Sequence, residues 1–153
     1  MAQDDLWTCL IADGFHLPEA FLKVAMKTKG SRAVLVSDAV YLSGLEPGQY
    51  DTHIGGQVVL TREGKLHMKE NEKLLAGSAR LLKDGVAHLV ETELCSLQEA
   101  WNMASIRPAL LMNPSRQVGL TEGAPADLVV FESQANEIRI EKTIKSGHHV
   151  YFP

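Results

Sequence analysis

The sequence is poor in cysteine and in long apolar runs. Only two of its 153 residues are cysteines, Cys9 and Cys95, and they form no Cys-x-x-Cys or Cys/His ligand spacing. This argues against a disulfide framework or a structural zinc site, so we expect a reducing, cytoplasmic environment. No apolar stretch approaches the roughly 18 residues of a membrane span. No basic segment precedes the first apolar run, so we expect neither secretion nor membrane insertion.

Clustered basic residues are also missing. The formal net charge is −4 and the sequence pI is about 5.8, with no stripe of Lys and Arg, so we expect no nucleic-acid partner. Apolar residues make up 45% of the chain and charged residues 22%, which is typical of a globular protein. A chain of 153 residues can bury the core of one ordinary domain, whereas a complete eight-stranded α/β barrel needs about 250 residues.

The first third of the chain predicts a strand, a helix and a second strand. An almost continuous apolar run from Leu6 to Ala12 predicts a strand that is buried on both faces. Apolar residues at helical spacing between Pro18 and Gly30 favour an amphipathic helix. The β-branched run from Ala33 to Val36 predicts the second strand. The unit implies a right-handed crossover between parallel strands.

Polar residues follow both predicted strands and should share one edge of the sheet. Asp38 follows the second strand, where a partly desolvated carboxylate can act as a base. A loop-capping Asp is the structural alternative. His16 could donate to an anion or a hydroxyl of a ligand, although a surface histidine would look the same. Asp13 lies on the same loop as His16.

The middle of the chain breaks the α/β alternation. Glycine and proline between Gly44 and Gly56 predict a loop, and residues 57–68 predict a β-hairpin whose turn contains Gly64. Leu75-Ala76-Gly77-Ser78 would then precede a helix capped by Ser78, and free amides at such a helix start favour oxyanions. An ordinary helix cap is the alternative there.

The rest of the chain predicts further helices and strands, without internal repeats. The expected helices are Leu97 to Met103 and Ser105 to Leu111, and the expected strands are Leu128 to Phe131, Ile138 to Lys145 and His149 to Phe152. The remaining histidines lack metal-type spacing, and we interpret them as structural or solvated: His53, His67, His88, His148 and His149.

Three segments, in their order and spacing, resemble N-acetylglucosamine-6-phosphate deacetylases of the amidohydrolase superfamily: Ile11-Ala12-Asp13-Gly14-Phe15-His16, Leu35-Val36-Ser37-Asp38-Ala39 and Leu75-Ala76-Gly77-Ser78. The glycines around Gly48-Gln49-Tyr50 and the closing Ala126-Asp127-Leu128-Val129 pattern fit the same resemblance. It covers nearly the whole chain.

The resemblance implies an α/β fold that is the C-terminal portion of a TIM-type (β/α)8 barrel with strands of a small β-sandwich domain. Residues 1–113 would hold the last barrel strands, Trp7 to Ala12 and Ala33 to Ser37, with their helices and a hairpin insertion near 57–68. Residues 114–153 would hold the C-terminal strands of the small β domain.

The resemblance also assigns roles. Asp38 would be the catalytic carboxylate that takes a proton from the attacking water and returns it to the departing amine. A divalent metal of zinc or iron type would make that water nucleophilic near neutral pH. The substrate, a phosphorylated amino sugar, would be contacted by two segments: Asp13, Gly14, Phe15 and His16, and Leu75, Ala76 and Gly77.

No part of the chain corresponds to the metal-binding residues of that family, which belong to its N-terminal half, so we assign no metal ligand here. We therefore expect the chain alone to be inactive. Unpaired sheet edges should make it associate with the missing N-terminal half or with itself. Two other readings remain open: a related cyclic-amide amidohydrolase, and a non-catalytic, self-associating domain.

Overall fold

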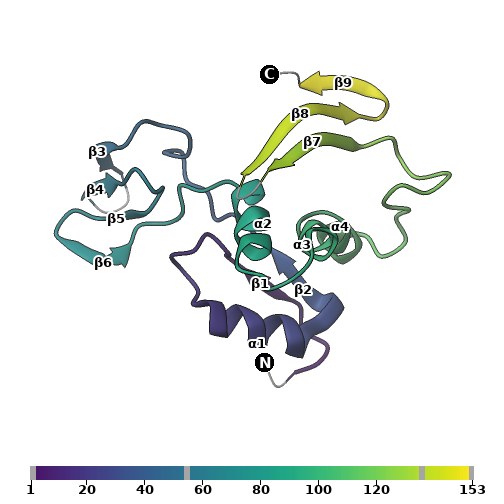
Figure 1. Ribbon diagram of the computed structural model, residues 1–153, viewed down its shortest axis with the longest axis horizontal. Helices are drawn as coiled ribbons and strands as arrows, with labels where there is room; N and C mark the ends of the chain where they lie inside the picture. Colours follow the sequence, from purple (N-terminus) through teal and green to yellow (C-terminus); the bar gives the residue numbers. More distant parts are fainter. Residues whose placement is uncertain (1–2, 54–55, 135–136, 152–153) are drawn as a thin grey trace.

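The computed structural model describes residues 3–53, 56–134 and 137–151. Within them it has an α/β arrangement of three separate β-sheets and four α-helices. The helices gather around a two-stranded sheet, while a four-stranded and a three-stranded sheet extend away from this centre in two directions (Figure 1). Across these ranges, no helix combines the length and the hydrophobicity that a membrane crossing requires.

The two-stranded sheet has the predicted strand-helix-strand connection. Strand β1 (Thr8–Leu10) leads into helix α1 (Glu19–Lys29), a 3₁₀ turn η1 (Gly30–Arg32) follows, and strand β2 (Ala33–Leu35) pairs with β1 in parallel. Gly30 closes α1, as the sequence predicts. The prediction of two parallel strands joined by a helix is confirmed.

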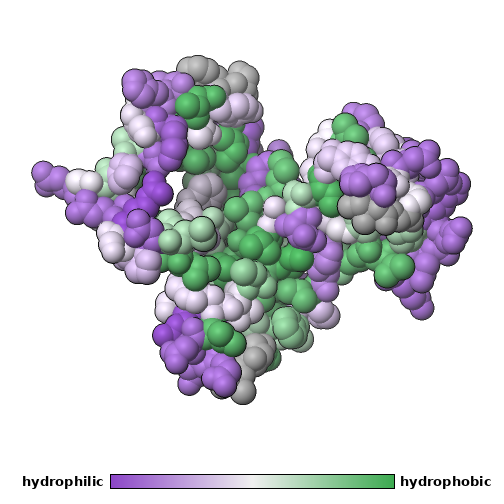
Figure 2. All heavy atoms as spheres, turned by 180° about the vertical axis from the view of Figure 1, so that it is seen from behind, coloured by the Kyte–Doolittle hydropathy of each residue, from purple (hydrophilic) through white to green (hydrophobic). Residues whose placement is uncertain are grey.

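Strand β1 is shorter and more exposed than predicted. We expected a strand from Leu6 to Ala12 buried on both faces, but Leu6 is 62% exposed and Cys9 is exposed, whereas Leu10 is buried. The reason is that, among the described residues, only β2 pairs with β1, and the main core includes Leu10 but neither Leu6 nor Cys9. Apolar side chains also gather across the middle of the molecular face seen in Figure 2.

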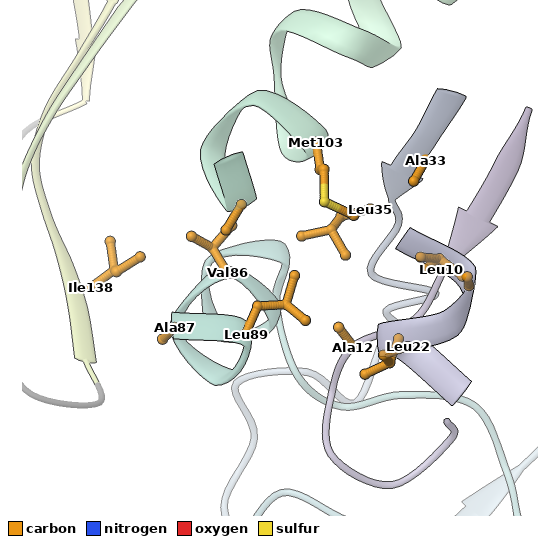
Figure 3. Close-up of a cluster of buried hydrophobic side chains, with 12 residues drawn as sticks. Leu10, Ala12, Leu22, Ala33, Leu35, Val86, Ala87, Leu89, Met103 and Ile138 are labelled. Atoms are coloured by element: carbon orange, nitrogen blue, oxygen red, sulfur yellow. The ribbon is translucent and has the colours of Figure 1, made fainter. Parts of the chain in front are cut away.

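The main core lies between this sheet and three helices (Figure 3). Helices α2 (Leu82–Glu91) and α3 (Leu97–Ala104) pack on β2 and on each other, α1 packs on both strands, and helix α4 (Ile106–Met112) also contacts β2. Each fully buried leucine stabilises the fold by about 1.5–3 kcal/mol, and the cluster fixes the strand ends that lead into the candidate site. Its buried members are Leu10, Ala12, Leu22, Ala25, Ala33, Leu35, Val86, Ala87, Leu89, Ala100, Met103 and Ile138.

A four-stranded antiparallel sheet carries its own small core. Its strands are β3 (Gly48–Thr52), β4 (Gly56–Leu60), β5 (Leu66–Met68) and β6 (Asn71–Leu75), in that order. The predicted hairpin at 57–68 is confirmed as β4 and β5. Four apolar side chains fill the buried centre of this second core: Leu42, Val58, Leu60 and Leu66.

The prediction of a loop between Gly44 and Gly56 is wrong for Gly48–Thr52, which form strand β3. Strand β3 pairs with β4, with Tyr50 opposite Val58. Its residues alternate between partly buried and exposed, which is the period of a strand with one covered face. The surrounding turn-forming residues hide this alternation in the sequence.

The C-terminal residues form a three-stranded antiparallel sheet of β7 (Leu128–Gln134), β8 (Glu137–Lys145) and β9 (His148–Tyr151). The three predicted strands are confirmed, although Phe152 lies outside the described residues. Trp101 of α3 stacks on Phe131 of β7, with ring centroids 4.3 Å apart, and this contact connects the sheet to the helices.

Arg107 should stabilise the fold through hydrogen bonds at the start of β2. Its side chain is 13% exposed, and it donates to the carbonyl oxygen of Ala33 (3.1 Å) and to Glu99 Oε1 (2.6 Å). Arg107→Met would leave a buried carbonyl without its donor, so we expect the free energy of unfolding to fall by about 1–3 kcal/mol in urea titrations. Arg139→Met, at a 64% exposed side chain, is the control. Equal losses in both variants would contradict this role.

Candidate functional site

Two of the predicted site segments meet at the end of β2. The amide of Ser78 donates to the carbonyl oxygen of Asp38 (3.2 Å), and the amide of Val40 donates to the carbonyl oxygen of Ser78 (2.9 Å). Ala39 and Ser78 form an isolated parallel bridge, and Ser78 is buried. The structure therefore brings the segment Leu75-Ala76-Gly77-Ser78 directly beside the candidate carboxylate.

Asp38 has an unusual backbone conformation at this junction. Its φ of 51° lies in the left-handed region, which costs a non-glycine residue about 1–2 kcal/mol and is found repeatedly at functional sites. The residue is exposed, so the expectation that Asp38 is partly desolvated is wrong for the described chain. The reason is that no described element covers this edge of the β1–β2 pair. Its carboxylate is accessible to a ligand.

The loop after β1 is organised by the buried carboxylate of Asp13. Asp13 Oδ1 accepts hydrogen bonds from the amides of Phe15 (2.9 Å) and His16 (3.0 Å), and Oδ2 lies 2.8 Å from His16 Nδ1. Burial raises the pKa of Asp13, but these hydrogen bonds and the nearby imidazole outweigh it and lower the pKa overall. Asp13, with 5% of its surface exposed, therefore supports the loop. The ligand contact predicted for it stays a prediction.

The same contacts orient the imidazole of His16. Because Nδ1 faces the Asp13 carboxylate, Nε2 is the ring nitrogen left for a ligand. The His16 side chain is 19% exposed. An oriented imidazole can donate to a phosphoryl or hydroxyl oxygen when it is protonated at Nε2.

Two residues that the sequence did not single out hold the rest of this loop. A Cβ on Gly14 would lie 3.3 Å from Cε1 of His88, so the His88 ring of α2 packs directly on the loop backbone. The guanidinium carbon of Arg80 lies 5.6 Å from the centroid of the Phe15 ring. Neither partner could be found by spacing, because each lies far from the loop in the sequence.

The prediction that Leu75-Ala76-Gly77-Ser78 lies at a helix N-terminus is wrong. Leu75 ends β6, and α2 begins only at Leu82, where Asp84 Oδ2 accepts from the amide of Leu81 (2.8 Å). The amide of Ser78 is used by Asp38, so the proposed anion site of free helix amides does not form. Ser78 resembled a cap because it is followed by a helical apolar pattern.

Gly77 is required at this junction for steric reasons. Its φ is +93°, and a Cβ would lie 2.6 Å from Val40 Cγ1, closer than real side-chain contacts allow. Leu75, Ala76 and Gly77 also line a mainly apolar cavity of about 250 Å³, together with residues that include Tyr41 and His53. These three predicted substrate-contacting residues thus lie between a cavity and the Asp38 segment.

The described residues supply no ligand set for a metal ion. No group of three or more His, Cys, Asp or Glu side chains among them is close enough to hold one. Asp38 offers one accessible carboxylate, while Asp13 is used within its loop. A metal at this edge would need most of its ligands from residues beyond those that the structure describes.

The lowered pKa of Asp13 predicts how stability depends on pH. A carboxylate whose pKa is depressed in the folded state stabilises the fold above the ordinary carboxyl range, and this contribution is lost as the pH falls through the folded-state value. Asp13→Asn should therefore lower the free energy of unfolding at pH 7 and flatten its fall between pH 7 and pH 3, as measured by urea titration. Asp51→Asn, at an exposed carboxylate of β3, is the control. If the free energy of unfolding of Asp13→Asn fell with pH as steeply as that of the wild type, the lowered pKa of Asp13 would be contradicted.

Comparisons with known proteins agree with the resemblance seen in the sequence. The chain is 31% identical over 139 residues to N-acetylglucosamine-6-phosphate deacetylase of Lysinibacillus sphaericus, which covers 90% of this chain and 34% of that protein. It is 34% identical to the Vibrio furnissii deacetylase of the same name, over 93% of this chain and 34% of the relative. The chain spans about a third of the length of these curated relatives.

The fold matches solved structures of the same enzymes. The crystal structure of N-acetylglucosamine-6-phosphate deacetylase from Thermotoga maritima superposes with a TM-score of 0.81 and 28% identity, covering 99% of this chain and 40% of that one. The sequence model described as the Amidohydrolase family matches residues 22–150. Since this match includes both β2 with Asp38 and the Leu75–Ser78 segment, the chain belongs to the amidohydrolase family.

Proposed function

We propose that the chain is the C-terminal part of a metal-dependent amidohydrolase that removes the acetyl group from N-acetylglucosamine-6-phosphate. The observation that carries this proposal is the junction of Asp38 with the Gly77-Ser78 backbone. It unites, at one sheet edge, two segments that resemble the catalytic and substrate-contacting segments of the deacetylases. The similarity to relatives that carry this name supports the choice of substrate.

In this proposal each segment has a separate task. Asp38 accepts a proton from the attacking water and returns it to the departing amine. His16, oriented by Asp13, donates to the phosphoryl group, and Gly14 and Phe15 shape the same loop. Leu75, Ala76 and Gly77, which precede Ser78 at the junction, contact the sugar.

The missing parts of the site would come from outside the chain. The β1–β2 pair would be the last two strands of a (β/α)8 barrel, and the strands β7–β9 would belong to a small β-sandwich. Val129, Val130, Val150 and Tyr151 of that sheet are each at least 40% exposed, which fits a sheet that the rest of the protein covers on both sides. The zinc or iron type metal would be held by the barrel residues that this chain lacks.

A cyclic-amide amidohydrolase would also use the Asp38 carboxylate, but its substrate would give no role to the Asp13 loop. An imidazole held by a buried carboxylate suits an anionic oxygen, which a phosphorylated sugar has and a simple cyclic amide lacks. The alternative of a non-catalytic, self-associating domain gives no role to the exposed Asp38 carboxylate or to the oriented His16 imidazole.

Complementation tests the proposed function. The chain would be fused to the remaining two thirds of the Lysinibacillus sphaericus relative, and acetate release from N-acetylglucosamine-6-phosphate would be measured with added zinc. We expect turnover by the fusion and a loss of at least about 10³-fold in kcat for Asp38→Asn, because the general base is removed.

Three controls make the outcome interpretable. The relative's own C-terminal third, joined in the same way, should be active. Asp51→Asn in the fusion should keep its kcat, because this exposed carboxylate lies on β3. Unchanged turnover in Asp38→Asn would sink the assigned role, and hydrolysis of cyclic amides in place of the sugar would favour the alternative substrate class.

A further inference from the structure

Arg80 contacts the Ser78 junction, the β4–β5 turn and the Asp13–His16 loop. Its backbone amide donates to Ser78 Oγ (3.2 Å), beside the junction with Asp38. Its guanidinium donates twice to the carbonyl oxygen of Glu63 in the β4–β5 turn, from Nε (3.2 Å) and from Nη2 (2.8 Å). The same group lies over the ring of Phe15, 5.6 Å from its centroid. One side chain thus contacts both the turn and the loop.

The contacts of Arg80 restrict the movement of the β4–β5 turn relative to the Phe15 ring. Hydrogen bonds from a charged donor are stronger than neutral ones, and a planar guanidinium can serve a carbonyl at its edge while its face lies on an aromatic ring. The stem packs against the turn, since a Cβ on Gly64 would lie 3.3 Å from both Cγ and Nε of Arg80. A movement of the turn relative to Phe15 would therefore break one of these contacts.

Core packing does not fix the position of the β4–β5 turn relative to Phe15. The four-stranded sheet has a core centred on Leu42, Val58, Leu60 and Leu66, which is separate from the main core beneath the Asp13–His16 loop. Figure 1 shows this sheet standing apart from the helices. Its orientation must then depend on the junction at Ser78 and on polar contacts such as those of Arg80.

We propose that Arg80 is a positioning residue that holds the four-stranded sheet, and with it Leu75, Ala76 and Gly77, in place relative to the Asp13–His16 loop. The inference rests on the proposed function only in naming these two segments as the two sides of a substrate site. The positioning itself is a property of the chain without ligand.

Amide hydrogen exchange of the purified chain, followed residue by residue with NMR, tests the positioning. In Arg80→Met we expect the amides of Phe15 and His16 to exchange about two- to fivefold faster, because a contact of cation–π strength is lost. The ring signals of Phe15 should shift as well. Arg80→Lys, which keeps the cation but loses the planar fork, should recover part of both effects.

Coupling between two groups is reciprocal, so the partner variant gives an independent test. Phe15→Leu should speed exchange of the Gly64 amide, which donates to the carbonyl oxygen of Thr61 (3.1 Å) in the β4–β5 turn. If Arg80→Met does not fold, Phe15→Leu alone tests the positioning role of Arg80. Arg62→Met removes the same charge from an exposed position of the turn and should change neither the Phe15 ring signals nor the loop amides.

The proposal is overturned if Phe15→Leu leaves the Gly64 amide unchanged, or if Arg62→Met loosens the loop as much as Arg80→Met. Both readouts are taken without sugar phosphate and without the rest of a barrel. A failure of the fusion to release acetate would therefore count against the proposed function alone, while a failure of these exchange measurements would count against Arg80 alone.

Discussion

Two backbone hydrogen bonds between Ser78 and the Asp38–Val40 segment hold the candidate site together. They join a stretch that follows a buried strand of the main sheet to a stretch that leaves the four-stranded sheet. Their geometry requires glycine at position 77, because any Cβ there would collide with Val40. The left-handed conformation of Asp38 belongs to the same junction. Sterics and hydrogen bonding thus fix where the carboxylate lies.

The second constraint is electrostatic and lies on the neighbouring loop. Asp13 is buried, and a buried carboxylate is costly unless donors surround it. Two amides and one imidazole provide those donors, and the net result is a lowered pKa and an oriented His16 ring. The loop therefore has one preferred shape before any ligand arrives. Such preorganisation would lower the entropic cost of binding the proposed substrate.

The sequence predicted those parts of the fold that depend on local patterns. The strand-helix-strand unit was predictable because the runs at Ala33 to Val36 and between Pro18 and Gly30 carry clear strand and helix patterns. Strand β3 was missed because its alternation lies among turn formers, and the start of α2 was misplaced because Ser78 has the chemistry of a helix cap. Both features depend on pairing with another segment: β3 pairs with β4, and Ser78 pairs with the Asp38–Val40 segment.

The site was predictable to a similar extent. Asp38, Asp13 and His16 were proposed from the rule that polar residues after parallel strands share an edge, and their roles in a site stay predictions. The bridge between Asp38 and Ser78, and the contacts of Arg80 with Phe15 and Glu63, were not predictable, because each joins residues that are distant in the chain. The exposure of Asp38 was not predictable either, because the sequence pattern indicated a strand end covered by neighbouring elements.

The central claim is that this chain carries the carboxylate and the substrate loop of an amidohydrolase but lacks most of the ligands for its metal. The most direct test is to measure acetate release from N-acetylglucosamine-6-phosphate by the purified chain alone with added zinc, together with the zinc bound per chain. We predict no turnover and well below one zinc ion per chain. Turnover with one bound zinc per chain would contradict the claim, because these residues would then supply a complete site.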